Sequence, residues 1–149
     1  IDLTSFVGLF LSREMVAAQG YPDPGLFLYG DDVIYTLSLR RRGFRIQFDP
    51  RVRFEHDCST FANDRQRVFQ PLWKVYYAYR NGLMMYRAAA GILFWPLMLL
   101  VVVKWRLTAG RYGDQRAAYL RLWRRAVRDG VLRRTEATLE DVKALAGER

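Results

Sequence analysis

Two adjacent carboxylates, Asp31 and Asp32, directly follow Gly30 and are the side chains best placed for acid–base chemistry in this sequence of 149 residues. A carboxylate beside a hydroxyl group can remove its proton while the oxygen attacks, and so acts as a general base. The pair begins a predicted helix, where the helix dipole favours negative charge. Aspartate is also a preferred helix cap. Position alone therefore leaves a catalytic and a capping interpretation open.

His56 is the only histidine, and it follows the predicted strand at residues 52–55. A histidine near carboxylates can bind Mn²⁺ or Mg²⁺, although a lone histidine is more often a hydrogen-bonded structural residue. One histidine and one cysteine, Cys58, exclude a Cys/His zinc site and an internal disulfide. A reducing compartment is the simpler interpretation.

Aromatic side chains could bind a sugar by stacking against its faces. Phe27 and Tyr29 lie next to the acidic pair, and we expect them to form the wall of an acceptor site. Four more aromatic residues lie in one predicted helix, where their spacing favours packing in the core. These four are Trp73, Tyr76, Tyr77 and Tyr79.

The elements that would position these residues alternate between strands and helices. The sequence predicts strands at residues 5–12, 45–48 and 52–55, and helices at residues 13–19 and 31–42. This alternation is typical of an α/β fold. Because the chain begins at Ile1 within a predicted strand and without an initiator Met, we expect it to be a fragment.

The second half of the chain is predicted to be helical and is strongly basic. Residues 1–64 carry a net charge of −2 and residues 65–149 a net charge of +11, within a total of +9. A helix is predicted from residue 72 to about residue 87, and a short amphipathic helix near the end with Thr138 as a possible N-cap.

An uncharged run at residues 88–103 precedes a stretch, 104–134, that has ten basic and two acidic residues. The run is slightly shorter than the roughly 20 residues that cross a bilayer. A buried helix, a single span and a helix on the membrane surface are all compatible with it. We favour attachment to the surface or shallow insertion, because basic segments are attracted to anionic lipids.

The order of these motifs resembles the C-terminal half of family 2 glycosyltransferases of the GT-A type, especially galactofuranosyl- and rhamnosyltransferase-like members. The matching runs are SFVGLFLSRE, GYPDPGLFLYGDD, LRRRGFRI, FEHD and PLWKVYYAYRNGLMMYR, the last of which contains the pair Arg80-Asn81. The resemblance covers residues 3–87 well and residues 88–134 loosely. It implies the acceptor-side part of a Rossmann-like GT-A domain at residues 1–87, followed by a helical, basic and membrane-associated region at residues 88–149.

The resemblance also implies roles for individual residues. Asp32 matches the general base that deprotonates the acceptor hydroxyl, and Asp31 matches its acidic neighbour. His56 matches a ligand of the Mn²⁺ or Mg²⁺ that binds the donor diphosphate. Arg80 matches a position that we expect to bind the acceptor, together with Tyr29 and Phe27.

The implied activity is inverting transfer of a sugar from a nucleotide-sugar donor to a glycan or a lipid-linked acceptor in cell-envelope polysaccharide synthesis. The implied location is the cytoplasmic face of the cell membrane. The family's Asp-x-Asp motif for the donor would lie upstream of Ile1, so we expect no turnover by these 149 residues alone.

Two other classes of function stay open. Residues 104–134 could bind nucleic acid, with Trp105, Tyr119 and Trp123 stacking on bases. The preceding apolar run has no purpose in such a protein, which makes nucleic acid the weaker interpretation. A non-catalytic scaffold is the third possibility.

Overall fold

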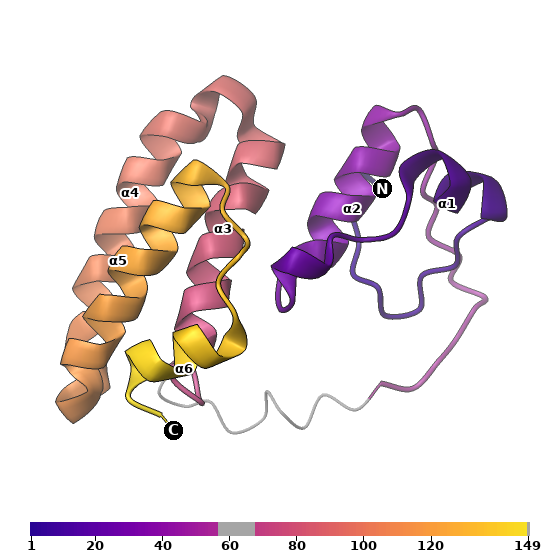
Figure 1. Cartoon of the computed structure of the whole chain (residues 1–149). Helices are drawn as coiled ribbons and strands as arrows, with labels where there is room; N and C mark the ends of the chain where they lie inside the picture. The colour runs from indigo at the N-terminus through magenta and orange to yellow at the C-terminus, as the bar shows by residue number, and fades with distance from the viewer. Residues whose placement is uncertain (57–67, 149) are drawn as a thin grey trace.

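The computed structural model describes residues 1–56 and 68–148, and every regular element in these two ranges is a helix. Figure 1 shows a bundle of helices beside a smaller N-terminal part. The predicted α/β fold, the acceptor-side part of a GT-A domain, is therefore wrong for the described residues, because they contain neither a strand nor a sheet.

The three segments predicted to be strands lack the partners that a strand requires. Alternating apolar and polar residues suit an extended chain, but a sheet forms only where backbone groups pair along a ladder. Segments 1–11 and 45–48 are joined by the amino group of Ile1, which donates to Ile46 O at 3.0 Å. One such bond makes no ladder, and Phe48 and Phe54 remain exposed.

The two helices predicted in the first half are confirmed. α1 (Arg13–Gln19) is capped by Ser12, whose hydroxyl accepts a hydrogen bond from Met15 N at 3.2 Å. The helix ends at Gly20, as the sequence predicts. α2 (Asp31–Arg41) ends one residue earlier than predicted.

Three longer helices form the bundle. α3 (Lys74–Ala90), α4 (Phe94–Leu107) and α5 (Arg116–Leu132) run alternately up and down in Figure 1. The 3₁₀ segments η3 (Gly91–Leu93) and η4 (Thr108–Gln115) connect them. α3 continues across residues 87 and 88, where the sequence places the boundary between the two regions; that division stays a prediction.

A short helix, α6 (Leu139–Ala146), closes the described chain near the start of α3. The predicted N-cap at Thr138 is confirmed: its hydroxyl accepts a hydrogen bond from Asp141 N at 3.2 Å. The Asp141 carboxylate accepts from Thr138 N at 3.1 Å, which completes a capping box. The Thr138 hydroxyl also donates to the Asp141 carboxylate at 2.9 Å, and this bond, followed by the one from Thr138 N, lowers the pKa of Asp141.

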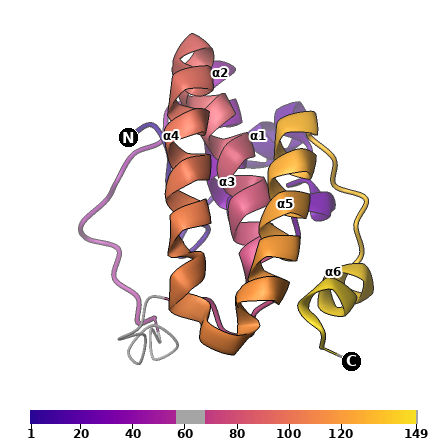
Figure 2. The same ribbon diagram turned by 90° about the vertical axis from the view of Figure 1, so that its left-hand side faces the viewer.

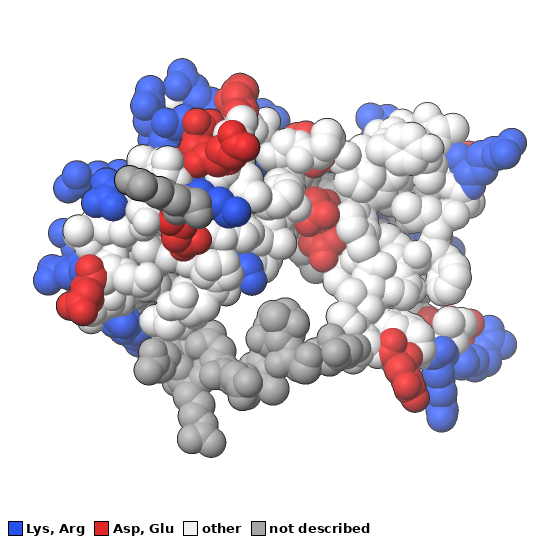
Figure 3. All heavy atoms as spheres, turned by 60° about the horizontal axis from the view of Figure 1, so that its bottom comes forward, with Lys and Arg blue, Asp and Glu red and all other residues white. Residues whose placement is uncertain are grey.

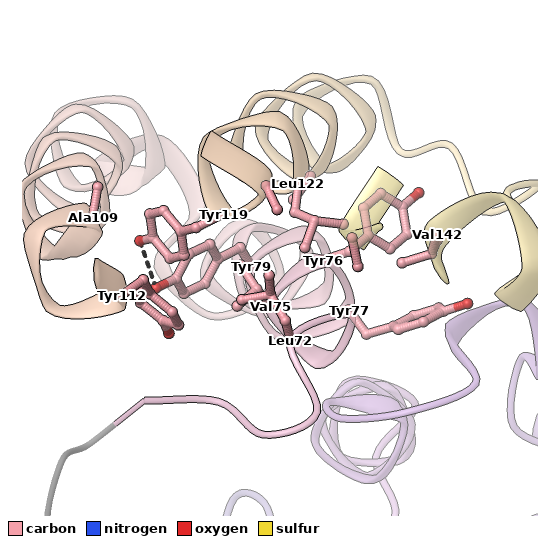
Figure 4. Close-up of a cluster of buried hydrophobic side chains, with 13 residues drawn as sticks. Leu72, Val75, Tyr76, Tyr77, Tyr79, Ala109, Tyr112, Tyr119, Leu122 and Val142 are labelled. Atoms are coloured by element: carbon pink, nitrogen blue, oxygen red, sulfur yellow. Dashed lines mark hydrogen bonds between the residues drawn. The ribbon is translucent and has the colours of Figure 1, made fainter. Parts of the chain in front are cut away.

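The core lies between α3, α5 and α6 and is rich in tyrosine (Figure 4). Tyr76, Tyr77 and Tyr79 on α3 are buried, which confirms that this aromatic stripe packs in the core. The hydroxyls of Tyr79 and Tyr119 lie 3.0 Å apart and share a hydrogen bond. Buried tyrosines need such partners, because an unpaired hydroxyl in the core is costly.

Gly130 sets how closely α5 approaches α3. A Cβ atom at this position would lie 2.8 Å from Arg80 O and 3.1 Å from the Leu83 Cβ. Only a residue without a side chain allows this contact between the helices. The backbone of α3 around Arg80 is therefore held directly against α5.

α2 lies along the other side of α3 and contacts it at both ends. At its start, a Cβ on Gly30 would come within 2.8 Å of the Met85 sulfur, and Gly30 has a φ of 82°. Near its end, the Arg41 guanidinium donates a hydrogen bond to Ala88 O. Together the two contacts place α2 against the C-terminal half of α3.

Candidate functional site

The acidic pair occupies the first two positions of α2, directly after its cap residue. The N-cap is Gly30, which has no side chain, so neither aspartate serves as the capping residue. The carboxylate of Asp32 accepts a hydrogen bond from Val33 N at 2.7 Å. Asp31 has no side-chain partner among the described residues. Both carboxylates are half-buried at the positive end of the helix dipole.

The loop that leads into this pair has an unusual backbone. Phe27 has a φ of 58° and Tyr29 a φ of 68°, and neither is a glycine. Bulky residues rarely adopt positive φ, and each costs about 1–3 kcal/mol unless the surroundings impose it. Such backbone conformations are concentrated at functional sites. The loop is therefore held in this conformation by contacts elsewhere.

The contacts come from two buried neighbours on α3, Arg80 and Asn81, which we call the loop clamp. Asn81 Nδ2 lies 2.8 Å from each of three backbone oxygens, and Arg80 Nη2 lies 2.7 and 3.1 Å from two. The five contacts reach Gly25 O, Leu26 O (twice), Leu28 O and Tyr29 O. Arg80 Nε also donates to Asn81 Oδ1 at 2.7 Å, which orients the amide group.

The clamp is itself supported from α5. The Arg80 guanidinium lies 5.1 Å from the ring centres of both Tyr76 and Tyr77, at cation–π distance. The Tyr76 hydroxyl donates to the buried Asp129 carboxylate at 2.8 Å, and Arg125 Nε donates to the same oxygen at 2.5 Å. Burial, followed by the bond to Asp129, raises the pKa of Tyr76 to about 12. A continuous chain of contacts thus runs from α5 to the loop.

The residues predicted to bind the acceptor fall into two groups. Phe27 is exposed, with its ring 5.1 Å from that of Tyr77 and 6.4 Å from that of Trp73. Tyr29 is half-buried beside Phe69, and burial raises its pKa. Arg80 instead lies behind the loop, fully buried. The structure therefore gives Arg80 a role in holding the loop, and its contact with an acceptor stays a prediction.

His56 is exposed at the end of the first described range. Within residues 1–56 and 68–148, no group of three or more His, Cys, Asp or Glu side chains lies close enough to hold a metal ion. Cys58 and Asp57 lie outside the described residues. The described side chains therefore do not form a metal site by themselves, and His56 stays a predicted ligand.

The aromatic residues considered for stacking on nucleic-acid bases are engaged inside the bundle. Tyr119 is fully buried, and the Trp105 ring stacks on that of Tyr79 at 4.2 Å. Trp123 is half-buried, with the Arg106 guanidinium 5.9 Å from its ring centre. Base stacking needs an exposed ring face, so this arrangement weakens the nucleic-acid interpretation.

The structure adds three residues that sequence reasoning did not assign to the site: Asn81, Tyr76 and Asp129. The signal for Asn81 is present in the sequence, because an Arg-Asn pair inside an otherwise apolar and aromatic helix must find buried partners. Its partners lie 52 to 55 residues earlier in the chain, and no local pattern identifies them.

Comparison with known proteins gives no further assignment: no family model, no curated protein and no solved structure matches this chain.

Proposed function

We propose that this chain carries the catalytic base of an inverting glycosyltransferase, and that Asp32 is this base. The observation that supports it best is the strained loop before Asp32, which the buried pair Arg80-Asn81 holds by five contacts. A fixed carboxylate is what general-base catalysis requires, since its efficiency depends on placement within hydrogen-bond reach of the proton.

The proposed reaction is one displacement. Asp32 takes the proton of an acceptor hydroxyl while that oxygen forms a bond to the anomeric carbon of the donor sugar. The bond from that carbon to the nucleoside diphosphate breaks, and the diphosphate leaves with the electron pair. Attack from the face opposite the leaving group inverts the anomeric centre. The ring of Phe27, exposed on this loop, is the proposed surface on which the acceptor ring packs.

The proposal rests on the ordered motifs and on the loop, and it uses no argument from an α/β fold. It also routes no step through a metal ion, because the described side chains do not complete a metal site. The competing explanation is that the clamp serves only to attach α2 to α3. In that case the carboxylate of Asp32 would be dispensable for activity.

Substitution of the carboxylate distinguishes these explanations. In the native-length protein, Asp32→Asn keeps the shape of the side chain and removes the base, so sugar transfer should fall by about 10²–10⁴-fold. Asp114→Asn is the matched control, because Asp114 is exposed on η4, far along the chain from the loop. Transfer is measured with radiolabelled nucleotide sugars and a membrane lipid extract. If the two variants transferred sugar at equal rates, the clamp would serve only to attach α2 to α3.

An apolar helical stretch in this chain is compatible with membrane association by its length and composition. Within Lys74–Leu132, an 18-residue window has a mean hydropathy of 1.9, and 6% of it is buried. The core helix of a soluble protein can be equally apolar, but such a helix is mostly buried. We propose peripheral attachment at the cytoplasmic face, where a lipid-linked acceptor would be available.

A further inference from the structure

One face of α4 is apolar and exposed. Leu99, Leu100, Val103 and Leu107 recur at helical spacing along it, and Leu100 and Leu107 are 72% and 77% exposed. In Figure 2, α4 lies nearest the viewer, in front of α3 and beside α5. Exposed apolar rows of this kind mark surfaces that bind a partner or a membrane.

The length of α4 decides how it can meet a bilayer. Its 14 residues extend for about 21 Å, whereas the hydrocarbon core is about 30 Å thick. Its other side is occupied by the core, since Trp105 packs against Tyr79 and Gly82 on α3. α4 therefore suits a position along the interface, with one face toward the acyl chains.

A hollow at the end of the apolar face combines two kinds of surface. It has a volume of about 500 Å³ and is lined by Leu100, Val103 and Leu107 together with Lys104 and Arg111. Thr108 also lines it, but its hydroxyl already donates to Trp105 O or pairs with Tyr119. The polar groups left to bind a ligand are the two cations.

Both cations are available. Neither Lys104 nor Arg111 makes an ion pair within the described residues, and both are exposed. In Figure 3, Lys and Arg side chains gather along the outer edge of the bundle on the side of α4 and α5. Two exposed cations beside three apolar side chains complement a phosphate group that is joined to alkyl chains.

We propose that this hollow binds an anionic phospholipid of the membrane. The phosphate lies between Lys104 and Arg111, and an acyl chain lies along Leu100, Val103 and Leu107. The lysine and arginine stems can extend along the apolar surface while their charges stay at the level of the headgroups. The inference rests on the membrane association proposed above, and it does not depend on the chemistry of Asp32.

The test measures binding to vesicles of phosphatidylcholine alone and of phosphatidylcholine mixed with phosphatidylglycerol. The double variant Lys104→Gln/Arg111→Gln should bind the mixed vesicles about 25-fold more weakly (about 2 kcal/mol), because each cation near an anionic surface contributes about 1 kcal/mol. The matched control is Arg42→Gln/Arg45→Gln, which removes the same charge from exposed residues near the end of α2. The control should lose less than threefold, about 0.7 kcal/mol.

Three results would overturn the proposal. If both double variants lost the same affinity for the vesicles, the attraction would depend on net charge alone. Membrane association would then stand, but the hollow would not be a defined lipid site. Competition by inorganic phosphate as strong as that by soluble short-chain phosphatidylglycerol would mean a simple anion site. If the unaltered protein did not bind the vesicles at all, the proposed membrane association would also be refuted. Asp32→Asn should bind vesicles normally while losing transfer, so failure of the lipid site and failure of the proposed chemistry are separable.

Discussion

Replacement of Asn81 by alanine tests what sets the backbone conformation of the loop that precedes the acidic pair: the loop clamp or the loop's own sequence. The Asn81 amide has two hydrogens and lies 2.8 Å from three backbone oxygens, so it supplies at most two full hydrogen bonds at a time. Its oxygen accepts a third from the Arg80 guanidinium at 2.7 Å. Asn81→Ala removes all of them.

The expected cost follows from those bonds. Two neutral hydrogen bonds contribute about 1 kcal/mol each and one to a charged group about 2 kcal/mol, so the loss is roughly 4 kcal/mol in the free energy of unfolding. Phe27 and Tyr29 would then no longer be held at positive φ, because relaxation of each recovers about 1–3 kcal/mol. The loop should therefore change conformation while the bundle remains folded.

Hydrogen exchange separates this local effect from a general loss of stability. Amide exchange should speed up across residues 26–34 in Asn81→Ala. Leu83→Ala is the matched control, since it empties a buried site one half-turn away on α3 and costs a similar 2–5 kcal/mol. It should leave the ratio of exchange rates between loop and bundle unchanged. The reasoning is refuted if the two variants give the same exchange pattern.

Two further predictions concern the supports of the clamp. Because burial and the bond to Asp129 raise the pKa of Tyr76 from 10.0 to about 12, the neutral form stabilises the fold fully below pH 10, and this stabilisation is lost as the pH rises through 12. Between those pH values, the unfolding free energy should fall by about 2 kcal/mol more in the unaltered protein than in Tyr76→Phe, as measured by urea unfolding. An identical fall in both proteins would contradict the assignment. Gly130→Ala places a Cβ 2.8 Å from the backbone of Arg80 and should lower the free energy of unfolding by about 2 kcal/mol. Gly110→Ala is the control, because a Cβ there has nothing within 4 Å and should change the urea midpoint little. Similar midpoints for the two variants would show that α5 can move away from α3 at little cost.

The sequence predicted the helices well where local signals determine them. α1 follows a serine cap and stops at Gly20, and the last helix begins with the capping box of Thr138. These signals act within four residues, so no long-range information is needed. The start of α2 at Asp31 was also predicted, although its N-cap is Gly30 and no side chain caps it.

The predicted strands failed because pairing is a long-range property. The alternation at residues 45–48 and 52–55 is real, but it specifies only which side chains share a face of an extended chain. A sheet also requires a ladder of backbone hydrogen bonds to a neighbouring strand, and the described residues contain no such ladder.

The acidic pair begins α2, as the sequence predicts, but its role in a site stays a prediction. Arg80 is fully buried behind the loop, and its contact with an acceptor also stays a prediction. Its guanidinium is held in the interior by hydrogen bonds to Gly25 O and Leu26 O and by the rings of Tyr76 and Tyr77. The loop clamp depends on contacts across more than 50 residues, which composition and spacing cannot reveal.

The most direct test of the central claim is the transfer rate of Asp32→Asn compared with Asp114→Asn in the native-length protein. Binding of the nucleotide-sugar donor is measured in parallel. If Asp32 is the base, Asp32→Asn loses about 10²–10⁴-fold in transfer while donor binding and hydrogen exchange of the loop stay unchanged. A rate for Asp32→Asn equal to that of Asp114→Asn would contradict the account.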